Sequence, residues 1–378
     1  MAYHDHENAE PTIKIDWQSL RTLNNPVGSV TTLQWDHDNN SPFYSSSRRT
    51  SRDPQTSLIT SNNPPNDWMH SIYNQISCLT LKEIVVPGSH DAGMFEFNEG
   101  AGLASPVNTV TQKIDIGSQL KYGSRYFDIR PVISGGGWKT GHYGWICILG
   151  VCEWRGGNGQ DLPSIINQVN SFTANNNELV ILDLTHGLYT DDFHGEHNSG
   201  LTQAQWDDLM TRLLRVNHRA IGFGRNSDIT NLKLFQLIQN TARVLIIVDD
   251  TTRLGKTVDT SRFADHGIFN RAQFKIINDY ADTNNQEKMV QDQLSLLKAQ
   301  RTSPTSTMLV LSWTLTQSNP TESIVDNGDA ANKALPELLW PALSPRTYPN
   351  VLMVDAYPKN SDIAALAMAI NLWHTKIC

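Results

Sequence analysis

The chain has 378 residues, 39% of them hydrophobic, so it can bury the core of one large domain or of two ordinary ones. The formal net charge of −8 argues against a nucleic-acid partner, because nucleic-acid phosphates are usually met by a basic protein face. No run of about 18 apolar residues occurs, so no membrane span is expected. Residues 1–15 lack the basic and apolar regions of a secretory signal.

Residues 1–65 are rich in Asn, Ser, Asp, Pro and Arg. Residues 36–57 have no hydrophobic period and few aliphatic side chains, which predicts loop or disorder. Residues 12–17 and 29–35 have the composition of short strands. We therefore expect a loop-rich or partly disordered N-terminal extension over residues 1–65, followed by a folded domain over residues 66–378.

Short apolar runs alternate with helical stretches in the folded domain. Continuous apolar runs of this length are typical of strands buried on both faces; they cover residues 83–86, 124–130, 179–184, 243–249, 274–277, 307–315 and 350–357. The helical stretches cover residues 161–172, 201–216, 284–300 and 361–373. The first starts at Asp161, and Thr202 is the expected N-cap of the second. This alternation predicts an α/β fold, either a TIM-type β/α barrel or a doubly wound sheet.

The four cysteines show neither a CxxC pair nor a zinc-site spacing. Cys147 and Cys152 flank residues 148–151, which are able to turn a hairpin. Facing strands would bring the two sulfur atoms close together, so a local disulfide is one interpretation. Two buried free thiols are the other, and the sequence favours neither.

Ionisable side chains follow the predicted strands. Active-site groups of a β/α barrel gather at the C-terminal ends of its strands. The first predicted strand ends in His90-Asp91, and the second carries Asp128 and Arg130, which share one face with Tyr126 because strand side chains alternate. The strand-end residues, together with the loop residue His142, are His90, Asp91, Asp128, Arg130, His142 and Asp355. Such a set can perform acid–base catalysis around a phosphate, because His moves protons and Arg holds phosphate oxygens.

Several motifs resemble the catalytic X region of phosphatidylinositol-specific phospholipase C. They are VVPGSHDAG at residues 85–93, YGSRYFDIR at 122–130, GHYG at 141–144 and MVDAY at 353–357, with NDWMHSI at 66–72 upstream. The resemblance covers roughly residues 66–373 in order. It implies a (distorted) TIM-type β/α barrel with an N-terminal extension, and a phospholipid substrate at a membrane surface.

The details resemble the metal-independent bacterial branch of the family. The calcium-dependent branch has Asn after the first His and a Glu-x-Asp pair on the second strand. This chain has Asp91 and the Asp128-x-Arg130 pair at those places, and Thr185 or His186 where the calcium branch has a glutamate. The resemblance therefore implies no metal and no other cofactor. Asp128 would position Arg130 or the catalytic base.

The bacterial roles transfer to the matching positions as a hypothesis. His90 would be the general base for the inositol 2-hydroxyl, and Asp355 would hold its other ring nitrogen. Arg130 would bind the phosphate oxygens. His142 would protonate the departing diacylglycerol oxygen, with support from Asp91. The product would be a cyclic inositol phosphate, so the implied enzyme is a lyase.

The headgroup pocket departs from the bacterial pattern. Bacterial enzymes have a lysine near the end of strand three, an arginine near the end of strand four and an Asp-x-Tyr pair on strand five. The matching candidates for substrate binding here are Thr185, His186, Asp250, Asn278 and Tyr280. These departures leave two alternatives: a phosphodiesterase of the same fold for another headgroup, or a lipid- or sugar-phosphate-binding module without turnover.

Two further segments carry hypotheses of their own. Residues 185–197 contain several His, Asp and Glu side chains, but their spacing fits no standard metal motif, which favours a solvated loop. Trp138, Trp145 and Trp154 lie in a glycine-rich segment that we expect to touch the lipid surface. A secreted or extracellular monomer, peripheral at membranes, fits these expectations.

Overall fold

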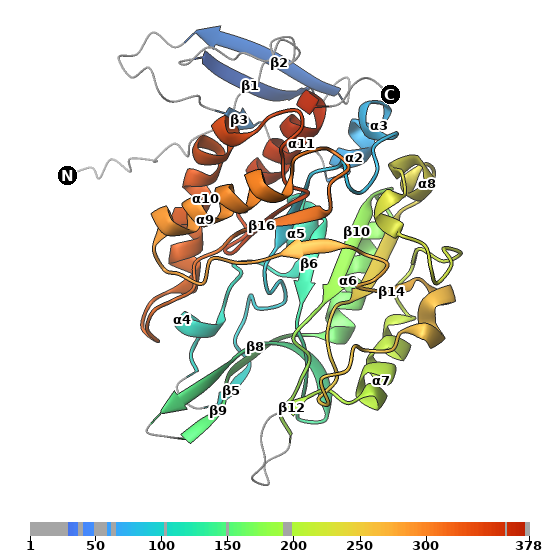
Figure 1. The fold of residues 1–378 in the computed structure, drawn as a ribbon, viewed down its shortest axis with the longest axis vertical. Helices are drawn as coiled ribbons and strands as arrows, with labels where there is room; N and C mark the ends of the chain where they lie inside the picture. The colour runs from blue at the N-terminus through green and yellow to red at the C-terminus, as the bar shows by residue number, and fades with distance from the viewer. Residues whose placement is uncertain are drawn as a thin grey trace, which may run out of the picture.

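The computed structural model describes residues 29–36, 41–48, 59–61, 66–101, 104–148, 151–191, 199–359 and 361–374. Its largest sheet has eight strands, and all neighbours in it run parallel. In spatial order they are β14 (Ile268–Asn270), β13 (Arg243–Val248), β10 (Leu179–Leu184), β6 (Tyr126–Ile129), β4 (Val86–Ser89), β17 (Val351–Val354), β16 (Met308–Trp313) and β15 (Ile276–Asn278). The sheet curls into an open barrel with β14 and β15 at its edges (Figure 1). The prediction of a distorted TIM-type barrel is confirmed, and the doubly wound alternative is wrong.

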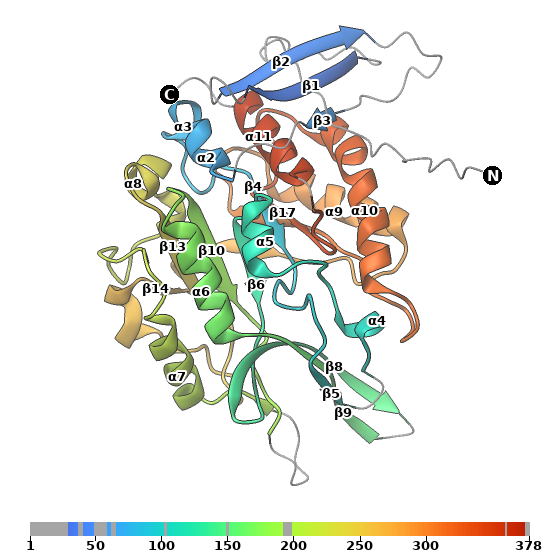
Figure 2. The same ribbon diagram turned by 180° about the vertical axis from the view of Figure 1, so that it is seen from behind.

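Helices cover the outside of the barrel, as the two opposite views show (Figure 1, Figure 2). The described α-helices are α2 (Trp68–Ser71), α3 (Tyr73–Ile76), α4 (Pro106–Thr109), α5 (Ile116–Lys121), α6 (Leu162–Thr173), α7 (Gln203–Leu213), α8 (Leu234–Ile238), α9 (Gln286–Gln300), α10 (Ile324–Leu339) and α11 (Asp362–His374). The 3-10 turns cover Ile229–Asn231, Ser261–His266 and Trp340–Ala342. Thr202 caps α7 with its side chain, as predicted, and Asp161, the predicted start of the first helical stretch, caps α6 in the same way. No helix in the described ranges is long and apolar enough to cross a membrane.

The apolar runs of the sequence are buried on both sides of the barrel wall. All six residues of β10 are buried. Leu179 and Ile181 join the cluster that includes the barrel interior, whereas Val180 and Leu182 join the cluster under α6 and α7. Because successive side chains of a strand point to opposite faces, one strand contributes to two cores. Asp183 alternates with Leu182 and therefore lies on the interior side.

A second sheet lies beyond the C-terminal ends of the barrel strands. Its order is β12 (Ser199–Gly200), β11 (Leu188–Tyr189), β7 (Pro131–Ser134), β8 (Gly137–Ile148), β9 (Val151–Asp161) and β5 (Glu99–Ala101). Strand β7 follows β6 after Arg130, so the second sheet starts at the mouth of the barrel. Strands β8 and β9 form a long antiparallel hairpin at the lower end of the molecule in Figure 1.

Three described segments of the extension form strands. Strands β1 (Ser29–Asp36), β2 (Ser41–Arg48) and β3 (Ile59–Ser61) form a small sheet at the opposite end of the molecule from the hairpin. The strand predicted over residues 29–35 is confirmed by β1. The loop predicted over residues 36–57 is wrong where β2 pairs antiparallel with β1, because pairing supplies the backbone hydrogen bonds that composition does not reveal. Residues 12–17 lie outside the described residues.

The barrel has one more strand than the apolar runs predicted. Strand β14 is only three residues long and was missed, because three residues are too few for a visible period. The run at residues 274–277 belongs to β15, which is therefore the sixth barrel strand and not the fifth.

Cys147 is disulfide-bonded, so the free-thiol interpretation is wrong for this residue. The hairpin register places Cys152 directly opposite Cys147, as the hairpin interpretation expected, although the Cys152 side chain lies outside the described part. Cys78 is also disulfide-bonded, and Cys378 lies beyond the described residues. Disulfides at both described cysteines are typical of proteins from oxidising compartments.

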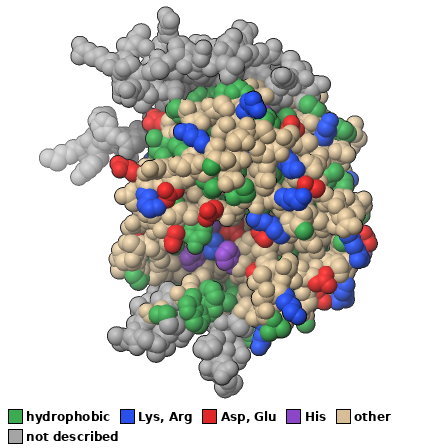
Figure 3. All heavy atoms as spheres, viewed as in Figure 1, with side chains coloured by type: hydrophobic (Ala, Val, Ile, Leu, Met, Phe, Trp, Pro, Cys, Tyr) green, Lys and Arg blue, Asp and Glu red, His purple; other side chains and the backbone are tan. Residues whose placement is uncertain are grey.

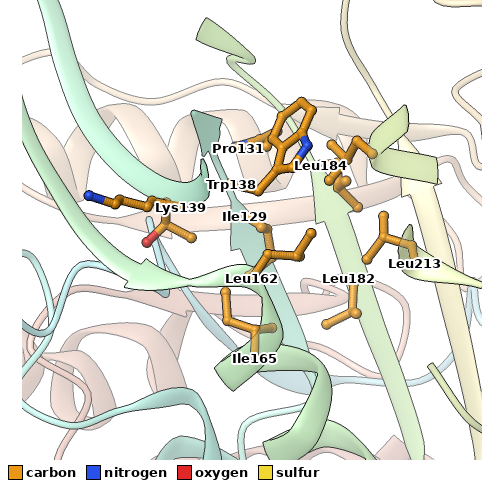
Figure 4. A pocket seen from close by; sticks show the side chains of 11 residues that line it. Ile129, Pro131, Trp138, Lys139, Leu162, Ile165, Leu182, Leu184 and Leu213 are labelled. Carbon is orange, nitrogen blue, oxygen red and sulfur yellow. The ribbon is translucent and has the colours of Figure 1, made fainter. Parts of the chain in front are cut away.

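Trp138 is part of the protein interior, which corrects the expectation that it touches lipid. Its side chain is 7% exposed, and its indole N–H donates to the Asp208 carboxylate at 2.7 Å. The ring lines a small apolar cavity together with Leu162 of α6 and Leu184 of β10 (Figure 4). Burial of a tryptophan with a satisfied N–H is ordinary core packing.

Candidate active site

His90 follows β4 directly and is held from two sides. Its Nδ1 atom lies 2.7 Å from Oδ1 of Asp355, which follows β17, the neighbouring barrel strand. Its backbone carbonyl accepts a 2.6 Å hydrogen bond from the Gln112 side chain, whose oxygen in turn accepts from the backbone N–H of Tyr357. The carboxylate and the amide together fix the imidazole ring and the turn that carries it.

Arg130 ends β6 with its guanidinium group in the middle of the site. Its Nη2 lies 2.6 Å from Nε2 of His90, and its Nε donates to Oδ2 of Asp128 at 3.1 Å. Asp128 also accepts from the Thr185 hydroxyl at 2.6 Å and from the backbone N–H of Asp91 at 3.0 Å. Asp128 is thus a fixed carboxylate that sets the direction of Arg130.

Arginine has donors but no acceptor. Nε2 of His90 must therefore accept from Arg130, and the Nδ1–H must donate to Asp355. In this arrangement His90 is neutral, and Nε2 carries the lone pair that a general base needs.

His142 reaches the site from the second sheet. It lies on β8, and its Nδ1 is 2.7 Å from Oδ2 of Asp91, a buried carboxylate. The same oxygen lies 3.6 Å from Nη1 of Arg130. A Cβ atom at Gly93 would lie 2.3 Å from the Thr140 hydroxyl of β8, so only glycine lets this strand approach the loop. Gly93, the last residue of the GSHDAG motif, therefore permits the approach of the strand that carries His142.

Charges in the site shift the pKa values of its members in opposite directions. Burial is the largest single influence on His90 and opposes its protonation, but the charge and hydrogen bond of Asp355, together with the charge of Asp128, raise the His90 pKa. Burial would raise the pKa of Asp128, but the Arg130 guanidinium and the hydrogen bond from Thr185 hold it far below its usual range. The positive charge of Arg130, with burial, lowers the pKa of His186 to about 4. The site therefore holds ionised Asp128 and neutral His186 at neutral pH.

The site lies in a hollow of the surface. Figure 3 shows histidine side chains on both sides of a basic group in this hollow, with acidic atoms above and hydrophobic atoms below. Three residues at the strand ends, Asp91, His186 and Ala356, have positive φ angles of 42°, 53° and 48°. Such backbone strain in non-glycine residues is frequent at functional sites.

The structure brings the six predicted catalytic residues together but not all predicted substrate-binding residues. Thr185 and His186 lie beside Asp128 and are hydrogen-bonded to each other at 2.8 Å. Asp250 is partly occupied by its own loop, because it accepts from the backbone N–H groups of Gly187 and Thr251.

Asn278 and Tyr280 lie on and after β15, so their assignment to strand five is wrong. Asn278 accepts from the Ser312 hydroxyl at 3.0 Å, and Tyr280 is 59% exposed.

Two residues of the site region were missed. Gln112 lies in a loop without a recognisable motif, and only the folded chain shows that it bridges the turns after β4 and β17. Arg271 follows the missed strand β14, forms an ion pair with Asp249 and donates to the Ile276 carbonyl. Arg271 therefore links the C-terminal end of β13 to β15 across the open side of the barrel.

The chain matches no protein-family model. It is 25% identical over 148 residues to the human protein "PI-PLC X domain-containing protein 2", a match that covers 34% of this chain and 46% of the relative. It is 36% identical over 87 residues to "1-phosphatidylinositol phosphodiesterase" of Staphylococcus aureus, covering 22% of this chain and 25% of the relative. The chain thus aligns with less than half the length of these curated relatives.

Solved structures extend the likeness over most of the chain. A phosphatidylinositol-specific phospholipase C from Staphylococcus aureus has a TM-score of 0.56 at 17% identity, covering 81% of this chain and 97% of that one. The enzyme of the same designation from Listeria monocytogenes has a TM-score of 0.54 at 13% identity, covering 78% and 95%. At these identities the structures establish the common fold.

Proposed function

Since the chain belongs to the phosphatidylinositol-specific phospholipase C X-domain family, we propose that it cleaves the glycerol-side P–O bond of a phosphatidylinositol-like lipid. One observation carries the proposal: two His–carboxylate pairs, His90–Asp355 and His142–Asp91, flank a single guanidinium at the barrel mouth. This is the arrangement that an acid–base reaction at a phosphodiester needs.

The proposed reaction is an intramolecular displacement at phosphorus. Nε2 of His90 takes the proton of the inositol 2-hydroxyl, and the oxygen attacks phosphorus. Arg130 holds the phosphate oxygens and offsets the charge that grows on them. The bond to the glycerol oxygen breaks, and that oxygen takes a proton from Nε2 of His142. Diacylglycerol and a cyclic inositol phosphate leave, and the proton passes back from His90 to His142 through water.

A fixed cation supports the metal-independent part of the proposal. Arg130 lies between Asp91 and Asp128, with 3.6 Å and 3.1 Å separating its nitrogens from their oxygens. The guanidinium thereby supplies positive charge beside the two carboxylates. Among the described residues, no three His, Cys, Asp or Glu side chains are grouped in a way that would hold a metal ion.

A second candidate is a phosphodiesterase of this fold for another headgroup. It is favoured by the surroundings of the site, where Thr185 and neutral His186 follow strand three and Asp249 is paired with Arg271. These groups offer a different set of donors and acceptors from that of the bacterial pattern.

The secreted or extracellular location stays part of the proposal, and so does the monomeric state. The disulfide bonds of Cys78 and Cys147 support the location, because thiols are kept reduced in the cytosol.

The test incubates the protein with phosphatidylinositol vesicles in excess chelator and follows phosphorus NMR. Formation of a cyclic inositol phosphate is expected, and the Arg130→Ala variant should form it roughly 10²–10³-fold more slowly. Product that forms only after calcium is added contradicts metal independence. Turnover of a different phospholipid alone favours the second candidate, and binding without any turnover favours a non-catalytic module.

A further inference from the structure

The β8–β9 hairpin has a stiff aromatic face that the proposed chemistry does not use. Trp145 lies opposite Trp154 in the register, and their rings meet edge to face with centroids 5.7 Å apart. The next pair toward the tip on that face is Cys147 opposite Cys152, and Cys147 is disulfide-bonded. Cross-strand aromatic pairs stabilise hairpins, so this pair is expected to hold the two strands together.

The end of the hairpin is rich in apolar residues, and its nearest charged residues are Glu153 and Arg155 of β9, opposite Ile146 and Gly144 in the register. Trp145 is 49% exposed, an unusual exposure for so large an apolar ring. Residues 141–152 contain no Asp, Glu, Lys or Arg, although the whole chain carries a net charge of −8. Helix α4 contacts β9 and carries another exposed apolar residue, Val107, which is 42% exposed.

The hairpin also carries a residue of the candidate site. His142 precedes Trp145 by three positions on β8, which corresponds to roughly 10 Å along a strand. Alternation turns Trp145 to the face opposite His142, so the indole can contact another surface while His142 stays paired with Asp91. Tryptophan prefers the headgroup level of a bilayer. A hairpin docked there would hold His142 close to the plane of the lipid phosphates.

We propose that the β8–β9 hairpin, through Trp145 and Trp154, docks the protein on the surface of a phospholipid bilayer. This inference rests on the proposed function only in that both concern a lipid, because docking needs no substrate headgroup. The net charge of −8 and the charge-free residues 141–152 argue against attraction to anionic lipid as the main force, so a hydrophobic contact is expected. Binding to zwitterionic vesicles is therefore expected to withstand salt.

The test is flotation of the full chain with vesicles of pure phosphatidylcholine, at low and at high salt. The Trp145→Ala variant is compared with Phe235→Ala, whose ring is 45% exposed on α8, at the opposite end of the barrel from the hairpin (Figure 1). We expect the partition coefficient to fall about tenfold or more for Trp145→Ala. Docking would remove the exposed half of the Trp145 indole from water, and the variant lacks this apolar surface. Phe235→Ala should bind like the wild type.

A second measurement covers the case that Trp145→Ala disturbs the hairpin. Tryptophan fluorescence of the wild type should be quenched by phosphatidylcholine brominated near the headgroup end of its chains. Trp145→Phe keeps an aromatic pair on the hairpin, and it should lose much of this quenching.

The outcomes separate docking from turnover. Trp145-dependent binding to phosphatidylcholine without phosphatidylinositol turnover leaves docking in place and removes the proposed function. Turnover combined with equal binding of wild type and Trp145→Ala overturns docking and leaves the function. Wild-type binding that requires phosphatidylinositol, or that disappears at high salt, also overturns the docking proposal.

Discussion

Nε2 of His90 lies 2.6 Å from Nη2 of Arg130, although the two residues are 40 positions apart in the chain. The lone pair that would accept a substrate proton is therefore already paired with the group that would bind the phosphate. A phosphate that draws the guanidinium toward its own oxygens would release Nε2. Phosphate binding and activation of the base would then be one event.

Removal of Arg130 is expected to raise the pKa of His90 further. The guanidinium charge lowers this pKa in the wild type, so its loss favours the imidazolium form. Histidine NMR titration of Arg130→Ala should show His90 titrating at higher pH, with turnover reduced by roughly 10²–10³-fold. Arg262→Ala removes an exposed arginine and should leave the titration unchanged. A fall in the His90 pKa would contradict the pairing.

Asp355→Asn is expected to move the pH profile in the opposite direction. The carboxylate raises the pKa of His90, so its loss lowers that pKa. A general base acts when it is deprotonated, and the rising limb of kcat/KM, which reports the free enzyme, should shift to lower pH. The plateau should fall by roughly 10²–10⁴-fold, because the ring loses the partner that fixes its tautomer. An unshifted limb, as expected for the surface control Asp292→Asn, would remove Asp355 from this role.

His142→Ala should be sensitive to the leaving group. A general acid is required when an alkoxide departs, and much less when a nitrophenolate departs, because the latter is stable without a proton. We expect a loss of roughly 10²–10⁴-fold with a diacylglycerol substrate and a far smaller loss with a nitrophenyl inositol phosphate. His90→Ala should be equally impaired with both substrates. Equal losses in His142→Ala would assign the acid to another group, and His186→Ala would be the next variant to measure.

Much of the site could be predicted from the sequence because its ionisable residues lie in or directly after strands that are visible as apolar runs. His90, Asp91, Asp128 and Arg130 sit in or just after two strands whose apolar runs are visible, and parallel strands place their C-terminal ends at one edge. His142 was expected in a loop, and its place on strand β8 could not be predicted because a β-bulge between Lys139 and Gly141 and a long hairpin lie outside any barrel rule.

The remaining parts depend on contacts between distant segments. Gln112 bridges two turns that are far apart in the chain, and no period marks it. Strand β14 is defined by pairing with β13 and not by its own three residues. Trp138 was expected to face lipid because composition does not distinguish a buried indole from an exposed one, whereas its bond to Asp208 does.

A buried ion pair is expected to hold the first helix against the barrel. Nε of Arg125 donates to Oε2 of Glu178 at 2.8 Å, and both side chains are fully buried. Glu178 also accepts from the backbone N–H groups of Met69 and His70 in α2. Arg125→Met should cost about 3–5 kcal/mol in urea unfolding, because it leaves a buried carboxylate without its cation.

The destabilisation by Arg125→Met should depend on pH. Burial raises the pKa of Glu178 even in the wild type, so the stability linked to its protonation is present at low pH and is lost as pH rises. The variant should therefore lose more stability at pH 8 than at pH 5. Arg212→Met breaks an exposed ion pair with Asp208 and should cost less than about 1 kcal/mol. Equal effects of the two substitutions would argue against a stabilising role of the buried Arg125–Glu178 ion pair.

Asp183→Asn is expected to remove a pH dependence of stability that originates inside the barrel. Asp183 accepts from the Tyr126 hydroxyl, and burial raises its pKa to about 7. The folded-state pKa lies above the unfolded value, so the protonated acid stabilises the fold at low pH, and this contribution is lost as pH rises from about 4 to about 7. The neutral amide cannot ionise, and unfolding of Asp183→Asn should vary less over this range than that of the wild type.

The difference should reach a few kcal/mol at most near pH 8, since one pKa unit corresponds to about 1.4 kcal/mol. Asp183→Asn is expected to be more stable than the wild type at this pH, because the wild type must hold a buried carboxylate beside ionised Asp128. Asp326→Asn on α10, as a control, should follow the wild-type curve. Parallel wild-type and Asp183→Asn curves between pH 4 and pH 8 would mean that Asp183 is ionised throughout, with Tyr126 donating to a carboxylate.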